Sequence, residues 1–394
     1  MLYVLILLPL LLGAGCAFVK EEAIAKAKVP LLAAQAVITV LSIVAAIWMN
    51  GTESAVWYMT ESLTFSLALD TFGAAVAVLI TVCWLLSIPY SSVYMPHSGA
   101  QSRYYCFLFL TEGVLLGTVL AADFVTLYLF YELTTLFSAP LVLHELNRNA
   151  LLGAGKYLYY SVGGAFLALF GLVALYSGGV DLRFTAGGHA VELTPVMLIG
   201  VFCVILGFAA KAGLYPLHNW LPAAHPAAPA PASALLSGLI AKAGVIAVVR
   251  VLFFTVDLTA LRGTWVQTVC VILALVTVFM GSFMGCFEKV LKKRLAYSSI
   301  SQISYVLLGL FLLSEEALTG SMLQLFFHAA AKIALFQCAG AVILLTGRTR
   351  TDELRGLGRK MPLLFIAFAL ASLSLVGIPP FGGFWSKWYL ARLN

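Results

Sequence analysis

Residues 207–222 read GFAAKAGLYPLHNWLP and follow a run of apolar residues that begins near position 195. Gly213 and Pro216 predict that the helix breaks just after Lys211, because proline removes a backbone donor and clashes with the preceding turn. At membrane depth, a broken helix is tolerated only where it lines protein or water. This stretch therefore predicts a helical membrane protein with a polar interior.

The composition of the whole chain agrees with this prediction. Of its 394 residues, 62% are hydrophobic and 10% are charged, and the mean hydropathy is +1.01. Soluble chains have about 45–50% apolar and about 25% charged residues. These values exclude a water-soluble enzyme, a nucleic-acid-binding domain and a disordered chain, and the short alternating strands of a β-barrel are absent. Because about 20 apolar residues cross a bilayer, we expect an all-α polytopic protein with about 12 transmembrane helices.

The apolar runs predict spans at 2–19, 30–49, 66–88, 104–121, 123–145, 152–177, 195–216, 231–255, 264–287, 294–313, 318–346 and 362–394. The first span has no positively charged start, so we expect it to be retained and not cleaved as a signal peptide. With the N-terminus outside, the inside loops hold fifteen basic residues and the outside loops only Arg183 and Arg262. Because cytoplasmic loops carry such an excess, we expect a multi-pass protein of the inner (plasma) membrane with its N-terminus outside.

Six charged residues fall well inside the predicted spans, namely Glu112, Glu132, Lys211, Lys242, Lys332 and Lys387. A charge at mid-bilayer costs at least ~2.5–3.5 kcal/mol, so most of these side chains must face one another or a hydrated interior. We interpret them as an ion or proton path. The alternative is a set of structural ion pairs, or side chains that snorkel near helix ends.

Other polar residues share faces with these charges. Gln324, His328 and Lys332 are spaced four residues apart and form one stripe on an apolar helix, which predicts that the stripe faces inward. Ser298, Ser301, Gln302 and Tyr305 give the preceding span a hydroxyl-rich face. His218 and His225 titrate near neutrality when unperturbed, and they are either functional or simply interfacial. The seven cysteines are scattered without a CxxC pair, so we expect no metal and no cofactor in this chain.

A second interrupted helix lies near the end, where residues 377–388 read GIPPFGGFWSKW. With this motif, the chain resembles the antiporter-like proton-translocating subunits of respiratory complex I. That family also includes the large subunits of Mrp-type Na+/H+ antiporters and of membrane-bound energy-converting hydrogenases. The match covers roughly residues 66–394, and residues 211–250 are its most specific part. RLAYSSISQI at 294–303 and GLGRKMP at 356–362 add to it.

The resemblance implies a fold of about fourteen helices with two inverted five-helix repeats and broken helices 7 and 12. Residues 1–103 would then hold helices 1–3, residues 104–255 the first repeat (helices 4–8), and residues 264–394 an incomplete second repeat (helices 9–12). The chain stops seven residues after Lys387, so we expect it to be truncated before helices 13 and 14.

The resemblance also implies a proton relay along five residues, Glu132, Lys211, Lys242, His328 and Lys387. We expect His218, His225 and Lys332 to support it. Glu112 lies outside the family motif, and it is expected to pair with Lys211 or Lys156 or to be peculiar to this chain.

The implied function is proton translocation within a multisubunit membrane complex, coupled to redox chemistry or Na+ exchange in partner subunits. The implied partners are other membrane subunits, H+ and possibly Na+, and the lipid bilayer, without nucleic acid. Three alternatives stay open: a stand-alone secondary transporter of a small solute, a non-pumping structural subunit, and an intramembrane enzyme. The enzyme has the least support, because the chain has no HExxH or GxSxG motif.

Overall fold

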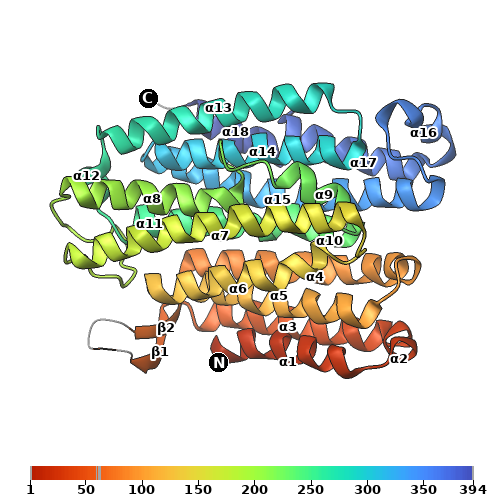
Figure 1. The fold of residues 1–394 in the computed structure, drawn as a ribbon, viewed down its shortest axis with the longest axis horizontal. Helices are drawn as coiled ribbons and strands as arrows, with labels where there is room; N and C mark the ends of the chain where they lie inside the picture. The colour runs from red at the N-terminus through yellow and green to blue at the C-terminus, as the bar shows by residue number, and fades with distance from the viewer. Residues whose placement is uncertain (1, 59, 61–63, 393–394) are drawn as a thin grey trace.

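Long helices run side by side through the molecule, and successive connections lie at alternate ends of it (Figure 1). The computed structural model describes residues 2–58, 60 and 64–392, so the last two residues of the final predicted span lie outside the described residues. Within this described part, nine helices are long and apolar enough to cross a membrane. Each of the predicted spans overlaps a helix, which confirms a mainly helical, multi-pass architecture.

The N-terminal elements are α1 (Leu2–Phe18), α2 (Glu21–Lys26), α3 (Lys28–Trp48), β1 (Thr52–Tyr58), β2 (Thr64–Leu69), α4 (Thr71–Tyr94), η1 (Met95–His97), α5 (Gln101–Leu120), α6 (Phe124–Val142) and α7 (Arg148–Ser177). The C-terminal elements are α8 (Pro195–Ala212), α9 (Leu221–Ala227), α10 (Ala230–Leu235), η2 (Leu236–Ile240), α11 (Lys242–Phe254), α12 (Leu258–Leu261), α13 (Trp265–Phe287), α14 (Leu291–Phe311), α15 (Glu315–Thr346), η3 (Thr351–Leu354), α16 (Leu357–Lys360), α17 (Pro362–Val376) and α18 (Gly382–Ala391).

A β-hairpin precedes α4, where the sequence predicts that a span begins at residue 66. Strands β1 and β2 pair antiparallel, with Thr52 opposite Leu69. The helix starts only at Thr71, because the Asp70 side chain accepts a hydrogen bond from Gly73 N (2.8 Å) and so caps the new helix. The backbone N–H of Ser66, on β2, donates a hydrogen bond to Asp123 Oδ2 (3.1 Å). The start of the predicted span was therefore wrong, since an apolar run does not distinguish a short buried strand from the first turn of a helix.

The two predicted helix breaks are present. α8 ends at Gly213 and α17 ends at Gly377, and both glycines have left-handed backbones, with φ of +88° and +87°. That conformation favours glycine and stops a helix. The four prolines of residues 221–234 predict a rigid loop, but this segment is instead largely helical, as α9 and α10. Pro222 and Pro231 are tolerated because they stand in the first turns, where the missing N–H has no helical partner.

Small residues bring α7 and α8 into close contact. A Cβ on Gly164 would lie 2.5 Å from Gly207 O and 2.8 Å from the Cβ of Ala210. Membrane helices associate through such small-residue contacts, because no hydrophobic driving force acts between them in lipid. This crossing fixes the end of α8, and with it the position of Lys211.

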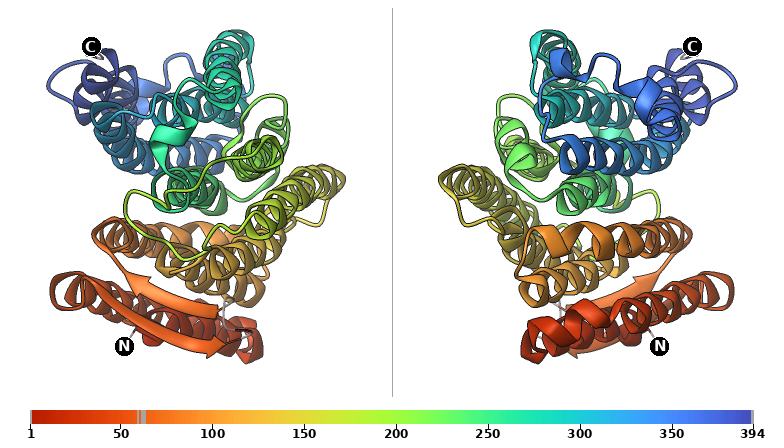
Figure 2. Two further views of the ribbon diagram at one scale, coloured as in Figure 1. Left: turned by 90° about the vertical axis from the view of Figure 1, so that its left-hand side faces the viewer. Right: turned by 90° about the vertical axis from the view of Figure 1, so that its right-hand side faces the viewer.

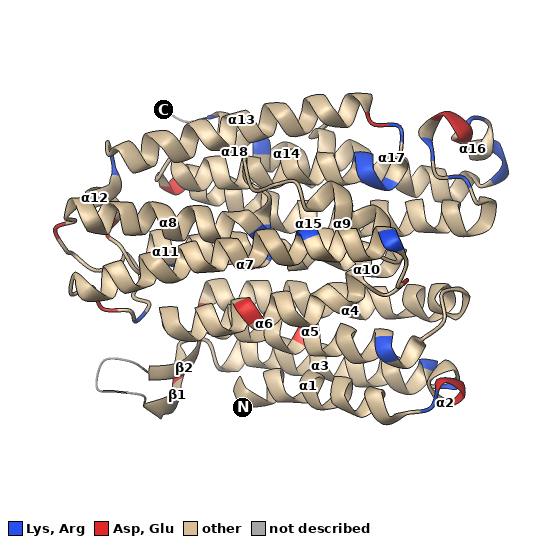
Figure 3. Cartoon of the chain, in the orientation of Figure 1, with Lys and Arg blue, Asp and Glu red and all other residues tan. Residues whose placement is uncertain are grey.

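The chain progresses laterally from one side of the bundle to the other. In both views of Figure 2, α1 and the hairpin lie at one extreme and α17–α18 at the other. Lys and Arg gather at the end of the bundle that carries α2 and α16 (Figure 3). The structure therefore places the loops that the sequence assigns to one membrane face at one end of the bundle.

Candidate functional site

Lys211 stands in the last turn of α8 and is fully buried. Its Nζ donates to Tyr131 O of α6 (2.8 Å) and lies 3.8 Å from the centroid of the Tyr131 ring. A cation over an aromatic face is attracted by the ring quadrupole. A neutral carbonyl and an aromatic ring therefore hold the ammonium.

Glu132, the next residue along α6, is the nearest acidic candidate for Lys211. Its carboxylate is half-buried, and Oε1 is buried without a hydrogen-bond partner. The two charges interact electrostatically. Among the described residues, however, no ion pair joins them within 4.0 Å. Glu132 and Lys211 are thus neighbours, but the ammonium is bound by the carbonyl of the residue before Glu132.

Lys242 begins α11, directly after the π-helix η2. Its Nζ donates to Ser237 O (3.0 Å) and Gly238 O (2.5 Å) in the turns just before it. Single π-helical turns widen the hydrogen-bond ladder and are frequent at functional sites. The Ser237 hydroxyl lies 2.7 Å from the Ser299 hydroxyl of α14, so the π-helical turn also contacts α14.

Lys332 lies on α15 and reaches the same face of α14. Its Nζ donates to Leu295 O (2.9 Å) and to Ser298 Oγ. Ser299 Oγ also donates to Leu295 O (3.0 Å). Lys242 and Lys332 are therefore connected through serine hydroxyls and backbone carbonyls of the η2 turn and α14. Gln324, His328 and Lys332 are all buried, so the prediction of an inward stripe is confirmed.

His328 and His225 are both fully buried, and none of their ring nitrogens has a hydrogen-bond partner. Lys242, Lys332 and Lys387 are the charged groups that act on His328. His225 stacks on Phe336 at 4.9 Å between ring centroids, so it is a core residue and not an interfacial one.

His218 lies outside this cluster. It is half-buried in the connection after α8, where its ring stacks on Tyr215 at 5.8 Å and its Nδ1 has no partner. The structure therefore does not bring it together with the buried lysines of α11 and α15.

Lys387 lies beyond the second helix break. Its Nζ donates to Leu375 O (2.6 Å) and Val376 O (2.9 Å), the last carbonyls of α17. The C-terminus of a helix carries partial negative charge, which suits a cation. A cavity of about 520 Å³ between α13, α14, α15 and α17 is bordered by Lys387, Ser298 and Gln302. This lysine can therefore contact a space that adjoins the partner of Lys332.

Lys292 belongs to the same group but is absent from the predicted site, because the sequence assigns it to a basic loop. It is buried in the first turn of α14, and its Nζ donates to Ala228 O (2.7 Å). Its spacing from Leu295 and Ser299 is three and seven residues, which places all three on one helical face. That spacing is the signal that could have identified it.

Glu112 makes no ion pair with Lys211 or Lys156 in the described chain, so the first of the two alternatives for this residue was wrong, and the second, that Glu112 is peculiar to this chain, stays a prediction. Its Oε1 accepts a hydrogen bond from Gln35 Nε2 (2.6 Å), on α3. Gln35, Thr39 and Ser42 are spaced four and three residues apart and form a polar face on an apolar span, which is a signal for an inward face but does not name Glu112 as the partner.

Neutral oxygen atoms bind the lysines of this site, of which Lys211, Lys242, Lys292 and Lys332 are buried and Lys387 is half-buried. An ammonium without an adjacent counter-ion is costly in a low-dielectric interior, whereas its neutral amine form is not. Such lysines are suited to gaining and losing protons. Within the described chain, no group of three or more His, Cys, Asp or Glu side chains could hold a metal ion.

Comparisons with known proteins identify the family of the chain. Residues 121–392 match the family described as NADH:quinone oxidoreductase/Mrp antiporter, transmembrane. NADH-quinone oxidoreductase subunit N of Desulforudis audaxviator is 32% identical over 333 residues, which cover 82% of this chain and 65% of the relative. Na(+)/H(+) antiporter subunit A1 of Staphylococcus haemolyticus is 32% identical over 349 residues, which cover 84% of this chain and 43% of that protein.

A solved structure has the same fold. A chain of the Mrp complex from Dietzia sp. superposes with a TM-score of 0.86 at 24% identity, over 99% of this chain and 73% of that one. The present chain thus spans between about two-fifths and two-thirds of the length of the curated relatives above. The match to the family over more than half of its residues shows that the chain belongs to the NADH:quinone oxidoreductase/Mrp antiporter family of membrane proteins.

Proposed function

We propose that this chain is a proton-translocating, antiporter-like subunit of a multisubunit membrane complex, and that Glu132, Lys211, Lys242, His328 and Lys387 form its relay. The observation that carries the proposal is the position of Lys211. Its ammonium is bound at Tyr131 O, one residue from a carboxylate with a free oxygen, yet the two make no ion pair in the described chain.

This geometry supports a switch between two positions of one side chain. In the position seen, the ammonium of Lys211 rests on a carbonyl and an aromatic ring. In the other position, it would contact Glu132, and the carboxylate would stabilise the charged form. Movement between the two positions changes how tightly the lysine holds its proton, which is the elementary step of a relay.

The remaining residues offer a path away from Lys211. Lys242 follows on α11, and the hydroxyls of Ser237 and Ser299 extend from its turn toward Lys332. His328, with both nitrogens unpartnered, lies among the charges of Lys242, Lys332 and Lys387. Neutral imidazole can both accept and donate a proton, so His328 suits transfer between the lysines. His225 and Lys332 would support this step, and His218 would serve only the connection after α8.

The assembly and the orientation are part of the same proposal. The energy for proton translocation would come from redox chemistry or Na+ exchange in partner subunits. The ions moved would be H+ and possibly Na+. The excess of basic loop residues at one end supports a location in the plasma membrane with the N-terminus outside. The helix breaks at Gly213 and Gly377 support an inverted repeat over 104–255 and an incomplete second one over 264–394.

The test is proton translocation by the reconstituted complex carrying Lys211→Ala, Glu132→Ala or the control Lys360→Ala. Lys360 is an exposed lysine at the end of α16. We expect translocation to fall to background in the first two variants and to stay at the wild-type rate in the control. Normal translocation in both Lys211→Ala and Glu132→Ala would overturn the relay. Measuring pH and Na+ gradients separately identifies the ion that moves.

A further inference from the structure

Glu112 and Gln35 form an isolated polar pair among α3, α4 and α5. Both side chains are fully buried, at 0% exposure. Gln35 Nε2 donates to Glu112 Oε1 (2.6 Å) and lies 3.5 Å from Thr81 O of α4. Thr39, one turn after Gln35, donates its hydroxyl to the same carbonyl (3.1 Å). Gln35 of α3 therefore contacts both Glu112 of α5 and the backbone of α4.

Two oxygen atoms of this pair are left without a partner. Glu112 Oε2 and Gln35 Oε1 are both buried, and neither makes a hydrogen bond. No Lys, Arg or His in the described residues lies within 4.0 Å of the Glu112 carboxyl group. A bare carboxylate without a cation would be very costly in this interior, since one neutral amide donor does not replace its hydration.

We propose that Glu112 is a proton-binding site, occupied as a neutral carboxylic acid that pairs with Gln35 and separate from the lysine relay. A protonated carboxyl group has one O–H donor as well as acceptor capacity. With the proton on Oε2, it supplies the donor that Gln35 Oε1 lacks, while Oε1 keeps the hydrogen bond from Gln35 Nε2. One proton therefore removes the charge and offers a partner to both unpartnered oxygens.

A bound metal cation would account less well for the two unpartnered oxygens of Glu112 and Gln35. Hard cations require a shell of several oxygen ligands. Here Gln35 donates the N–H of its side-chain amide to Glu112 Oε1, and an N–H group cannot bind a cation. Thr81 O, the carbonyl near Gln35 Nε2, already accepts from Thr39. The donors of this pair thus suit a carboxylic acid.

The test is infrared spectroscopy of the full chain in lipid, because the C=O stretch of a protonated carboxyl group is separate from carboxylate and amide bands. We expect the wild-type minus Glu112→Gln difference spectrum at neutral pH to contain the band of one protonated carboxyl group. Glu316→Gln is the matched control. Glu316 is exposed to solvent, so its difference spectrum should lack the band. Absence of the band for Glu112 would overturn the proposal.

Two further infrared measurements test which group binds at Glu112 and whether Gln35 is its partner. Adding NaCl should leave the band unchanged, whereas its loss with Na+ would show that a metal cation replaces the proton and would also overturn the proposal. In Gln35→Leu, the band should persist and shift to higher wavenumber, because the hydrogen bonds from Gln35 are gone. An unshifted band would exclude Gln35 as the partner of the acid. None of these readouts depends on transport, so their outcome is independent of whether the proposed lysine relay is correct.

Discussion

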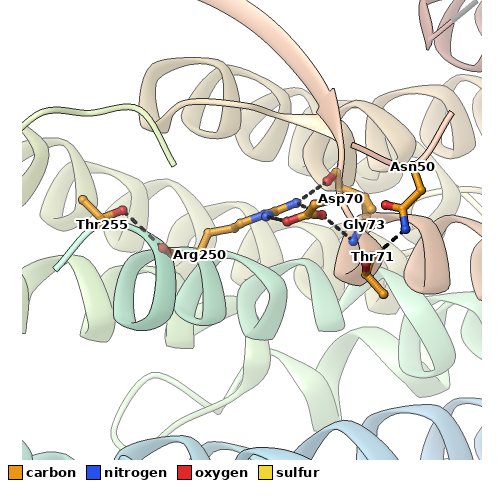
Figure 4. Close-up of polar contacts among 7 residues, drawn as sticks. Asn50, Asp70, Thr71, Gly73, Arg250 and Thr255 are labelled. Atoms are coloured by element: carbon orange, nitrogen blue, oxygen red, sulfur yellow. Dashed lines mark hydrogen bonds and ion pairs between the residues drawn. The ribbon is translucent and has the colours of Figure 1, made fainter. Parts of the chain in front are cut away.

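Arg250 Nη1 lies 2.5 Å from Asp70 Oδ2, and Arg250 Nη2 lies 3.0 Å from Asp70 Oδ1, across 180 positions of sequence (Figure 4). The guanidinium side chain is 3% exposed and the carboxylate side chain 35% exposed. Arg250 Nη2 also donates to Val119 O (3.1 Å) at the end of α5. Because Asp70 also caps α4, this one ion pair connects α11 to the start of α4 and the end of α5.

Removing the guanidinium should destabilise the fold. In Arg250→Ala, Asp70 and Val119 O lose their buried partner. Breaking a buried pair costs about 3–5 kcal/mol, and the partial exposure of Asp70 reduces this to about 2–3 kcal/mol. We expect a lower midpoint in thermal unfolding in detergent. The control is Arg183→Ala, an exposed arginine at the same end of the bundle. Equal loss of stability in both variants would contradict a special role for the pair.

The same pair should make stability depend on pH in the acid range. Burial opposes ionisation of Asp70, but the hydrogen bond and the charge of Arg250 outweigh burial and hold the pKa of this carboxyl group below its usual value. A lowered pKa in the folded state stabilises the protein above the unfolded pKa, about 3.9, and this contribution is lost as the pH falls through the folded value.

The measurement for this prediction is the difference in unfolding midpoint between wild type and Asp70→Asn at several pH values. We expect a constant difference near neutrality that closes once the pH falls below about 4. A difference that grows on acidification would mean that the carboxylate is not stabilised by Arg250.

Adjacent glycines of α7 should differ sharply in their tolerance of alanine. A Cβ on Gly164 would meet Gly207 O at 2.5 Å, which is backbone and cannot rotate away, whereas a Cβ on Gly163 would meet nothing within 4 Å. Overpacking of this kind costs about 1–3 kcal/mol. We expect Gly164→Ala to lower stability and to disturb the end of α8, and Gly163→Ala to behave as wild type. If the two variants unfold alike, the close crossing of α7 and α8 is not required.

The hydroxyl pair between Ser237 and Ser299 should show energetic coupling. Each single alanine variant leaves one buried hydroxyl without its partner, 2.7 Å away in the wild type. We expect a coupling energy of about 1 kcal/mol in a double-mutant cycle of stability. Proton translocation should slow in both single variants and should not recover in the double variant. Wild-type translocation in the double variant would place the path elsewhere.

Much of the site could be predicted from single residues. Charges inside apolar spans pointed to Lys211, Lys242, Lys332 and Lys387, because a bilayer accepts such residues only in an interior. Periodicity placed Gln324, His328 and Lys332 on one face. What could not be predicted were partners far apart in sequence. The neighbours of Lys211 on α6, the amide that holds Glu112 and the ion pair of Arg250 with Asp70 all depend on which helices lie side by side.

The amino-acid sequence by itself determined that the chain crosses the membrane many times, at which ends its loops lie, and where two helices break. These properties follow from transfer of each segment into lipid and from the local backbone preferences of glycine and proline, so they need no knowledge of neighbouring helices. Tertiary structure alone decided which oxygens bind the buried lysines, and that Lys292 joins them. It also decided that Glu112 stands apart from them. Those outcomes depend on how helices pack laterally, and local sequence does not encode the choice of neighbour.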